Sequence, residues 1–123
     1  MPFWTQFDDS PHEVRTRTPD GRDLLFLTGT AGFGLKGQGQ TWAGDDAYHL
    51  VGPFWRRIDS VAPMASIGSA YNEHTAVDAG WATDNCRWVN YGGRILLVVF
   101  CVVSDIDGWL YRFNYQVTAL GLL

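Results

Sequence analysis

The clearest pattern in the chain is an alternation of apolar and polar residues near its C-terminus, between Trp109 and Leu120. Alternation with a period of two is typical of a β-strand that buries one face. We therefore expect one side of this strand to face the core. The residues on that side are Trp109, Tyr111, Phe113, Tyr115, Val117 and Ala119, and those on the other are Leu110, Arg112, Asn114, Gln116 and Thr118.

The dipeptide Asp107-Gly108 lies between this segment and an unbroken apolar run, Ile95 to Val103. Asp-Gly favours a two-residue hairpin turn, because a type I′ turn needs positive φ at both central positions. The sequence thus predicts a hairpin that joins the two segments. Its register would pair Ile106 with Trp109, Val102 with Phe113, Phe100 with Tyr115 and Val98 with Val117, and all of these pairs would face the main core.

In this register the other face of the hairpin is mixed. Leu97, Val99, Cys101 and Val103 would lie opposite Thr118, Gln116, Asn114 and Arg112. A solvent-facing sheet rarely carries so many aliphatic side chains. We therefore expect this second face to be covered by another layer of the chain, by the far side of a barrel lumen or by a neighbouring subunit.

Turn signals recur at short spacing along the rest of the chain. Tyr91-Gly92-Gly93 predicts a hairpin loop that pairs Asn90 with Arg94, and Pro19-Asp20-Gly21 predicts a turn between strands at 12–18 and 23–28. Further strands are predicted within 48–58, 63–71 and 75–81, with a turn or bulge at Thr83-Asp84-Asn85.

Helix signals are scarce, because Gly or Pro interrupts most windows and the chain has only one Lys and two Glu. With no repeat or linker visible, we predict a single all-β domain over residues 1–123. The expected fold is an antiparallel β-sandwich or jelly roll of about eight strands, and a small β-barrel is the alternative.

Charge and composition exclude some partners. Nine Lys and Arg stand against thirteen Asp and Glu, for a net charge of −4, so capture of nucleic acid is not expected. The longest apolar run is too short for a membrane-spanning helix. No signal peptide is visible, which fits a cytoplasmic protein or a secreted one after removal of a leader. Cys86 and Cys101 are expected to be free, largely buried thiols.

Sequence motifs for cofactors or metals have simpler explanations. The Gly32–Gly37 segment matches a dinucleotide-binding pattern but is not followed by a helix, so we interpret it as a glycine-rich strand or loop. Asp105–Gly108 resembles part of a Ca²⁺ loop but lacks the remaining ligands. The histidines, His12, His49 and His74, lack metal-ligand spacing. We therefore predict no cofactor or metal.

A candidate ligand site begins with Trp42, which lies in a glycine-rich segment directly before Asp45 and Asp46. An aromatic ring can stack on the apolar face of a sugar, and carboxylates can accept hydrogen bonds from its hydroxyl groups. Trp109 is a second aromatic residue beside a turn. The alternative interpretation is that Trp42 packs on the core and that the two aspartates only add solubility.

An alternative site combines Arg112, Asn114 and Gln116 with Cys101. In a barrel these side chains would line the lumen and hold the polar part of a ligand. In an oligomer they would form the polar part of an interface.

These observations favour a non-catalytic, oligomeric binding module for carbohydrate, since no catalytic signature is visible. One alternative is a small barrel that binds an apolar molecule, as a carrier or as a cyclase or isomerase. A second alternative is a structural subunit of a larger assembly.

Overall fold

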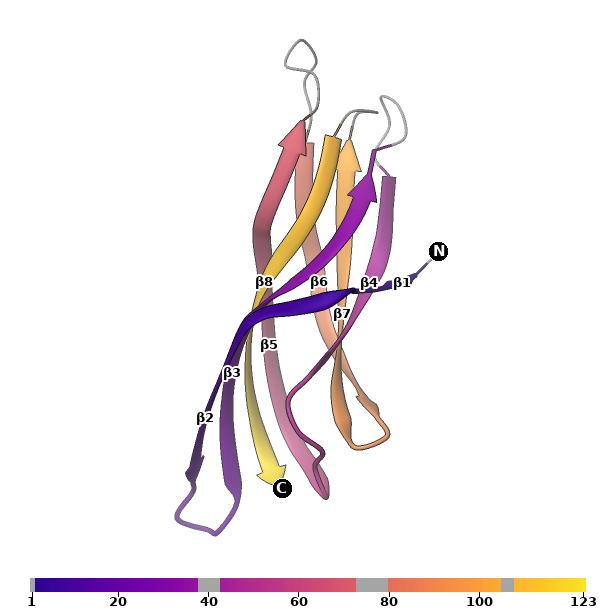
Figure 1. Cartoon of the computed structure of the whole chain (residues 1–123). Helices are drawn as coiled ribbons and strands as arrows, with labels where there is room; N and C mark the ends of the chain where they lie inside the picture. Colours follow the sequence, from indigo (N-terminus) through magenta and orange to yellow (C-terminus); the bar gives the residue numbers. More distant parts are fainter. Residues whose placement is uncertain (1, 38–42, 73–79, 105–107) are drawn as a thin grey trace.

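The computed structural model describes residues 2–37, 43–72, 80–104 and 108–123, and this part of the chain forms eight strands and no helix (Figure 1). The strands are β1 (Phe3–Trp4), β2 (Phe7–Arg17), β3 (Asp23–Lys36), β4 (Ala43–Val51), β5 (Arg57–Asn72), β6 (Gly80–Tyr91), β7 (Arg94–Ser104) and β8 (Gly108–Leu122).

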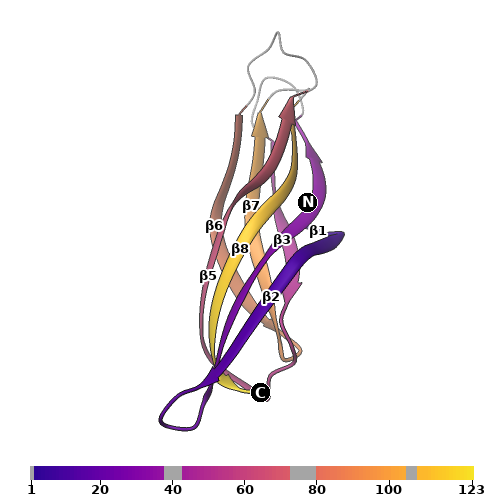
Figure 2. The same ribbon diagram turned by 60° about the vertical axis from the view of Figure 1, so that its left-hand side comes forward.

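The strands form two four-stranded sheets that lie as two layers (Figures 1 and 2). Sheet A has the order β1-β4-β7-β6, and sheet B has the order β2-β3-β8-β5. All neighbouring strands are antiparallel except β1 and β4, which are parallel. The predicted all-β sandwich is confirmed. The barrel alternative is wrong, because the two sheets do not close into one cylinder.

The N-terminal segment links the two layers. Only Thr5 and Gln6 separate β1, at the edge of sheet A, from β2, at the edge of sheet B (Figure 2). The backbone N–H of Thr5 donates to the carbonyl of Tyr48 in sheet A, and that of Gln6 donates to the carbonyl of Gly32 in sheet B. Both amides of the crossover are therefore paired, one with each sheet.

The core lies between the inner faces of the central strands β7 and β8. Phe113, Tyr115 and Val117 of β8 are buried as predicted, but the predicted faces of β7 are wrong. The fully buried inner residues of β7 are Leu97, Val99, Cys101 and Val103, whereas Val98, Phe100 and Val102 lie on the outer face. The layer that covers the aliphatic face is sheet B itself.

The predicted hairpin between 95–106 and 109–120 is also wrong. β7 pairs with β4 and β6, and β8 pairs with β3 and β5, so the two strands belong to different sheets. The Asp107-Gly108 dipeptide favours only a local turn. Each of the two strands instead pairs on both sides with strands from other parts of the chain. The apolar side chains of β7 and β8 therefore meet across the core rather than side by side in one sheet. Residues 105–107 lie outside the described residues.

The two other predicted hairpins are present. β2 and β3 join at 18–22, and β6 and β7 join at Gly92-Gly93, whose φ values of 59° and 93° suit glycine. The second hairpin pairs Tyr91 with Arg94, not Asn90 with Arg94, because the loop has two residues instead of three.

The alternation predicted for β8 changes phase at Tyr111. The register with both neighbouring strands shifts there, which marks a bulge. Leu110 is consequently buried, while Trp109 and Tyr111 lie on the outer side with Arg112. The bulge expected near Asn85 in β6 is confirmed, since Asn85 has a φ of 50° and the pairing shifts between Asp84 and Arg87. The predicted strand at 75–81 is described only from Gly80 onward.

Cys86 and Cys101 are both free thiols, as predicted, and Cys101 is fully buried. Burial raises the pKa of Cys101 to about 12 and also raises the pKa of Cys86. Neither thiol is therefore activated as a nucleophile.

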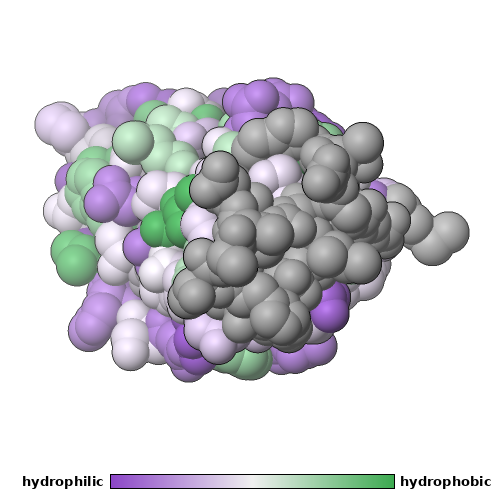
Figure 3. Space-filling model, turned by 90° about the horizontal axis from the view of Figure 1, so that it is seen from above, coloured by the Kyte–Doolittle hydropathy of each residue, from purple (hydrophilic) through white to green (hydrophobic). Residues whose placement is uncertain are grey.

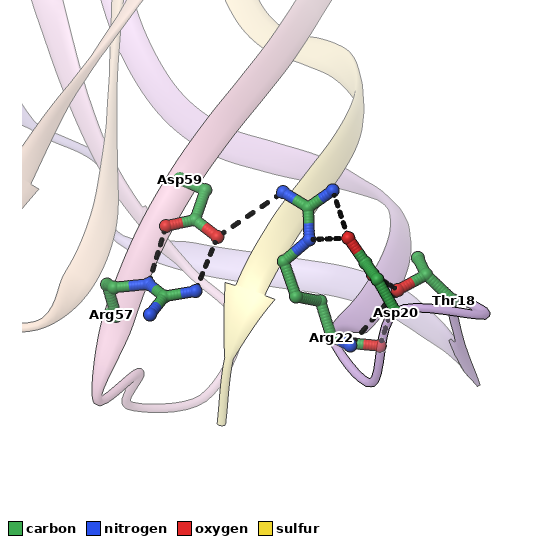
Figure 4. Close-up of polar contacts among 5 residues, drawn as sticks. All are labelled: Thr18, Asp20, Arg22, Arg57 and Asp59. Carbon is green, nitrogen blue, oxygen red and sulfur yellow. Dashed lines mark hydrogen bonds and ion pairs between the residues drawn. The ribbon is translucent and has the colours of Figure 1, made fainter.

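An ion-pair network joins the β2–β3 hairpin to the start of β5 (Figure 4). Arg22 pairs with Asp20 at 2.9 Å and with Asp59 at 3.5 Å, and Asp59 also binds Arg57 at 2.7 Å. Arg57 holds the pKa of Asp59 below its usual value, whereas Thr18, followed by Arg22, lowers the pKa of Asp20. These exposed groups lie at the lower end of sheet B in Figure 1.

Candidate functional site

The structure separates the residues of the first predicted site. Trp42 lies outside the described residues. Asp45 pairs with the buried Cys101, while Asp46 pairs with Phe100 on the outer face and binds Arg87 at 2.9 Å. Neighbouring strand residues point to opposite faces, so these two carboxylates do not face one ligand together.

Trp109 belongs to the other sheet, where it pairs with Lys36 and Tyr71. A role for any of the four residues in ligand binding stays a prediction.

The alternative site is partly brought together. Arg112, Asn114 and Gln116 lie along the outer side of β8 in sheet B. Cys101 lies in the core on the inner side of sheet A. The lumen that would have joined them does not exist, because core side chains fill the space between the sheets. The three polar residues of β8 therefore form a surface of their own.

This surface contains a shallow groove with a volume of about 430 Å³. We call the outer side of sheet B, with this groove at its centre, the groove face. The groove runs across β3, β8 and β5 and reaches Ser10 of β2. Its residues are Ser10, Thr28, Gly29, Thr30, Met64, Ala65, Ser66, Asn114, Tyr115 and Gln116.

Strand register explains why these side chains meet. Asn114 lies between Thr30 on β3 and Ser66 on β5, and one rung below, Gln116 lies between Thr28 and Met64. Directly opposed residues of neighbouring strands project from the same face of a sheet. The Thr30 hydroxyl donates to the Asn114 side-chain oxygen at 2.9 Å, which fixes the orientation of the amide. Two rungs of hydroxyl and amide groups are thereby presented to solvent.

Aromatic and charged side chains border the groove on one side. The Arg112 guanidinium binds Asp9 at 3.1 Å and lies 5.4 Å from the centre of the exposed Phe7 ring. The Phe7 ring itself rests on Gly32, where a β-carbon would overlap it. A side chain at position 32 would therefore displace the Phe7 ring.

A second aromatic group lies farther along β8. Trp109 and Tyr111 stack with ring centres 5.6 Å apart and an interplanar angle of 3°. The Lys36 ammonium lies 5.2 Å from the Trp109 ring. Seen from above, hydrophobic and hydrophilic side chains both reach the sides of the molecule (Figure 3).

A partly buried polar network lies behind the groove, at the crossover between the sheets. His49 of β4 is buried, with Nδ1 2.6 Å from the Thr5 hydroxyl and Nε2 3.1 Å from Asp8 Oδ2. The Tyr115 hydroxyl donates to the same Asp8 oxygen at 2.5 Å. Gly29 makes this approach possible, because a β-carbon there would collide with Tyr115 and Asp8.

The protonation states of this network follow from its geometry. Burial lowers the pKa of His49 despite the nearby Asp8, so its imidazole is neutral. Nε2–H then donates to the Asp8 carboxylate, and Nδ1 accepts from Thr5. Burial, followed by the Asp8 hydrogen bond, raises the pKa of Tyr115, which keeps its hydroxyl protonated.

The order Thr–His–Asp resembles a nucleophile with its general base and orienting acid. However, Thr5 Oγ1 also lies 3.1 Å from the Tyr48 carbonyl, and neither the groove nor the smaller cavity between β5 and β6 is lined by Thr5 or His49. We therefore interpret the network as a latch that fastens the crossover to both sheets. In the sequence His49 stands out only as a possible ligand, and no local spacing links it to Thr5 or Asp8.

Comparison with models of protein families, with curated proteins and with solved structures finds no significant match to this chain. Within the described part of the chain, no cluster of three or more His, Cys, Asp or Glu residues could hold a metal ion. The same residues include no helix long and apolar enough to cross a membrane. Functional inference therefore depends on the surfaces of this chain.

Proposed function

We propose that this protein is a non-catalytic carbohydrate-binding module whose ligand occupies the groove face. The observation that carries the proposal is the composition of the groove. Its central residues are hydroxyl and amide side chains from three strands: Thr28, Thr30, Ser66, Asn114 and Gln116. These groups can both donate and accept hydrogen bonds, as sugar hydroxyl groups do.

The absence of charge along the groove supports a neutral ligand. Of its lining residues, only Tyr115 is titratable, and its hydroxyl is held by Asp8 with a raised pKa. This lining offers no carboxylate or imidazole for general acid–base catalysis. Binding without chemistry is therefore the function that these side chains support best.

Size and rigidity also fit small-ligand recognition. The groove volume of about 430 Å³ lies in the range of ordinary ligand pockets. Side chains held on a sheet are positioned more precisely than those on loops. The Phe7 ring at the border, exposed and stabilised by Arg112, offers an apolar surface on which a sugar ring could pack.

A glycan array, followed by calorimetry on the best ligand, tests this proposal. Wild-type protein should bind at least one neutral glycan. The double variant Asn114→Ala/Gln116→Ala should bind it at least tenfold more weakly, because each lost hydrogen bond contributes about 1 kcal/mol. Thr118→Ala is the matched control, since Thr118 lies on the same side of β8 but outside the groove.

The control variant should bind like the wild type. Unchanged affinity in the double variant, or no neutral glycan bound by the wild type, would contradict the proposal.

A further inference from the structure

The outer side of sheet A carries a group of neighbouring aromatic and aliphatic residues. We call this side the aromatic face. Leu96 and Val98 of β7 point outward yet are only 6% and 4% exposed, and they are not part of the inner core cluster. Their cross-strand neighbours in sheet A are Leu50, Tyr48, Val89 and Arg87.

Three rings gather over these aliphatic residues. Trp4 of β1 meets Tyr48 of β4 and Tyr91 of β6 edge-on, with ring centres 5.5 Å and 5.8 Å apart. Since β4 and β7 separate β1 from β6, the Trp4–Tyr91 contact spans the width of the sheet. The rings exclude water from Leu96 and Val98 but are themselves left partly uncovered.

The exposure that remains is large. Trp4, Val89 and Tyr91 are 49%, 48% and 52% exposed, and all lie on this one face. The outer side of an antiparallel sheet that faces water usually carries polar residues. A contiguous aromatic and aliphatic patch on a sheet face instead indicates an interaction surface.

Charges of both signs border this patch. Arg87 and Asp46 form an ion pair across β7, and Asp84 lies on the same side of β6. The centre is thus apolar and the border polar, as in protein–protein interfaces. Because Arg87 and Asp46 are already paired within one copy, this pair would bring no unpaired charge into a two-fold interface.

We propose that the aromatic face binds a second copy of this chain, face to face, to form a two-fold dimer. The three long strands of sheet A, each nine or more residues long, present roughly 500 Å² of flat surface per copy, from the usual strand spacing and rise. The two copies together would then bury about 1,000 Å², which is the lower limit for a specific interface. The size and charge pattern of the face therefore suit a second copy.

This dimer would direct the two groove faces away from each other, because sheets A and B form opposite layers of each copy (Figures 1 and 2). This consequence depends on the proposed carbohydrate function. A dimer of this shape would cross-link two glycan-bearing surfaces rather than bind one surface twice.

Sedimentation velocity over a wide concentration range tests the dimer. Val89→Lys places a charge in the aromatic face, and Val14→Lys is the matched control, since Val14 is an exposed edge-strand valine of sheet B with 61% exposure. Wild-type protein and Val14→Lys should sediment at twice the chain mass of 13.8 kDa, and Val89→Lys at the single-chain mass. Circular dichroism should show that both variants are folded.

If Val89→Lys does not fold, Tyr91→Arg in the adjoining hairpin replaces it, with the same expected loss of the dimer. A monomeric wild type, or a dimer that persists in the folded aromatic-face variant, would overturn the proposal.

The two proposals fail separately. Asn114→Ala/Gln116→Ala should lose glycan binding and remain a dimer. Val89→Lys should keep the wild-type affinity for a single glycan but lose the ability to cross-link glycan-coated beads. A dimer that binds no glycan would refute only the carbohydrate function.

Discussion

The outer sides of the two four-stranded sheets both expose large apolar residues, but they differ along their central strands β8 and β7. The central strand of sheet B places Asn114, Gln116 and Thr118 outward, whereas the central strand of sheet A places Leu96 and Val98 outward. The inner sides of both strands are equally apolar. The comparison teaches that burial against the other sheet constrains only one face of each strand, and the second face is available for interactions outside the core.

The largest expected difference concerns the centres of the two faces. Leu96→Ala should lower the free energy of unfolding by about 2–5 kcal/mol, because it empties a space that Trp4 and its neighbours cannot refill. Gln116→Ala on the matching strand of sheet B should change it by less than about 0.5 kcal/mol. Urea denaturation measures the change in the free energy of unfolding for both variants, with the same m-value used for each. Equal losses would mean that the aromatic cover of Leu96 is not formed in solution.

A second, smaller effect concerns the latch that joins the two sheets. Burial lowers the pKa of His49 below the unfolded value of about 6.5, so the unfolded chain binds a proton more readily. The contribution of neutral His49 to the free energy of unfolding is therefore complete above about pH 6.5. It is lost as the pH falls from about 6.5 toward the pKa of His49 in the folded state. Asp8 opposes the shift and Arg94 adds to it.

Urea midpoints measured between pH 8 and pH 5 test this sign. The slope from His49 can reach about 1.4 kcal/mol per pH unit, which corresponds to one proton. His49→Gln should be less stable at neutral pH and should lose part of the pH dependence. His12→Gln, on the exposed edge strand β2, is the control for a histidine outside the latch. A profile that is identical in the wild type and His49→Gln would contradict the latch.

The smallest expected effects come from the ion pairs at the borders of the two faces. Arg87 binds Asp46 on the aromatic face at 2.9 Å, and Arg112 binds Asp9 on the groove face at 3.1 Å. Both pairs are partly exposed, so Arg87→Ala and Arg112→Ala should each cost about 1 kcal/mol or less, and less still at high salt. Each of the two changes is added to the Val89→Lys variant, and thermal unfolding is measured. Because this background is expected to be monomeric, dimer dissociation does not affect the comparison. A loss of stability well above about 1 kcal/mol in either variant would show that the ion pair contributes more than a partly exposed pair should.

Local patterns were sufficient to predict the all-β class, the approximate number of strands and two of the hairpins. Alternation in β8 identified Phe113, Tyr115 and Val117 as core residues, and the glycines at 92 and 93 marked a turn. These features depend on neighbouring residues alone. The polar row of Arg112, Asn114 and Gln116 was also visible in the sequence, but its partners Thr28, Thr30 and Ser66 were not, because strand order brings them together.

Tertiary structure decided the remaining features. An apolar run such as Ile95–Val103 fits either face of a sheet equally well, so only its pairing with β4 and β6 shows that Leu97, Val99 and Cys101 face the core. The Asp107-Gly108 signal favoured a hairpin, yet pairing with strands far along the chain placed β7 and β8 in different layers. Likewise, Thr5, Asp8 and His49 meet only because the crossover lies against β4. The sequence by itself determined which residues turn, extend and avoid water, because these are short-range properties; which side of each sheet is buried, and against what, is a long-range property that only the packed sheets decide.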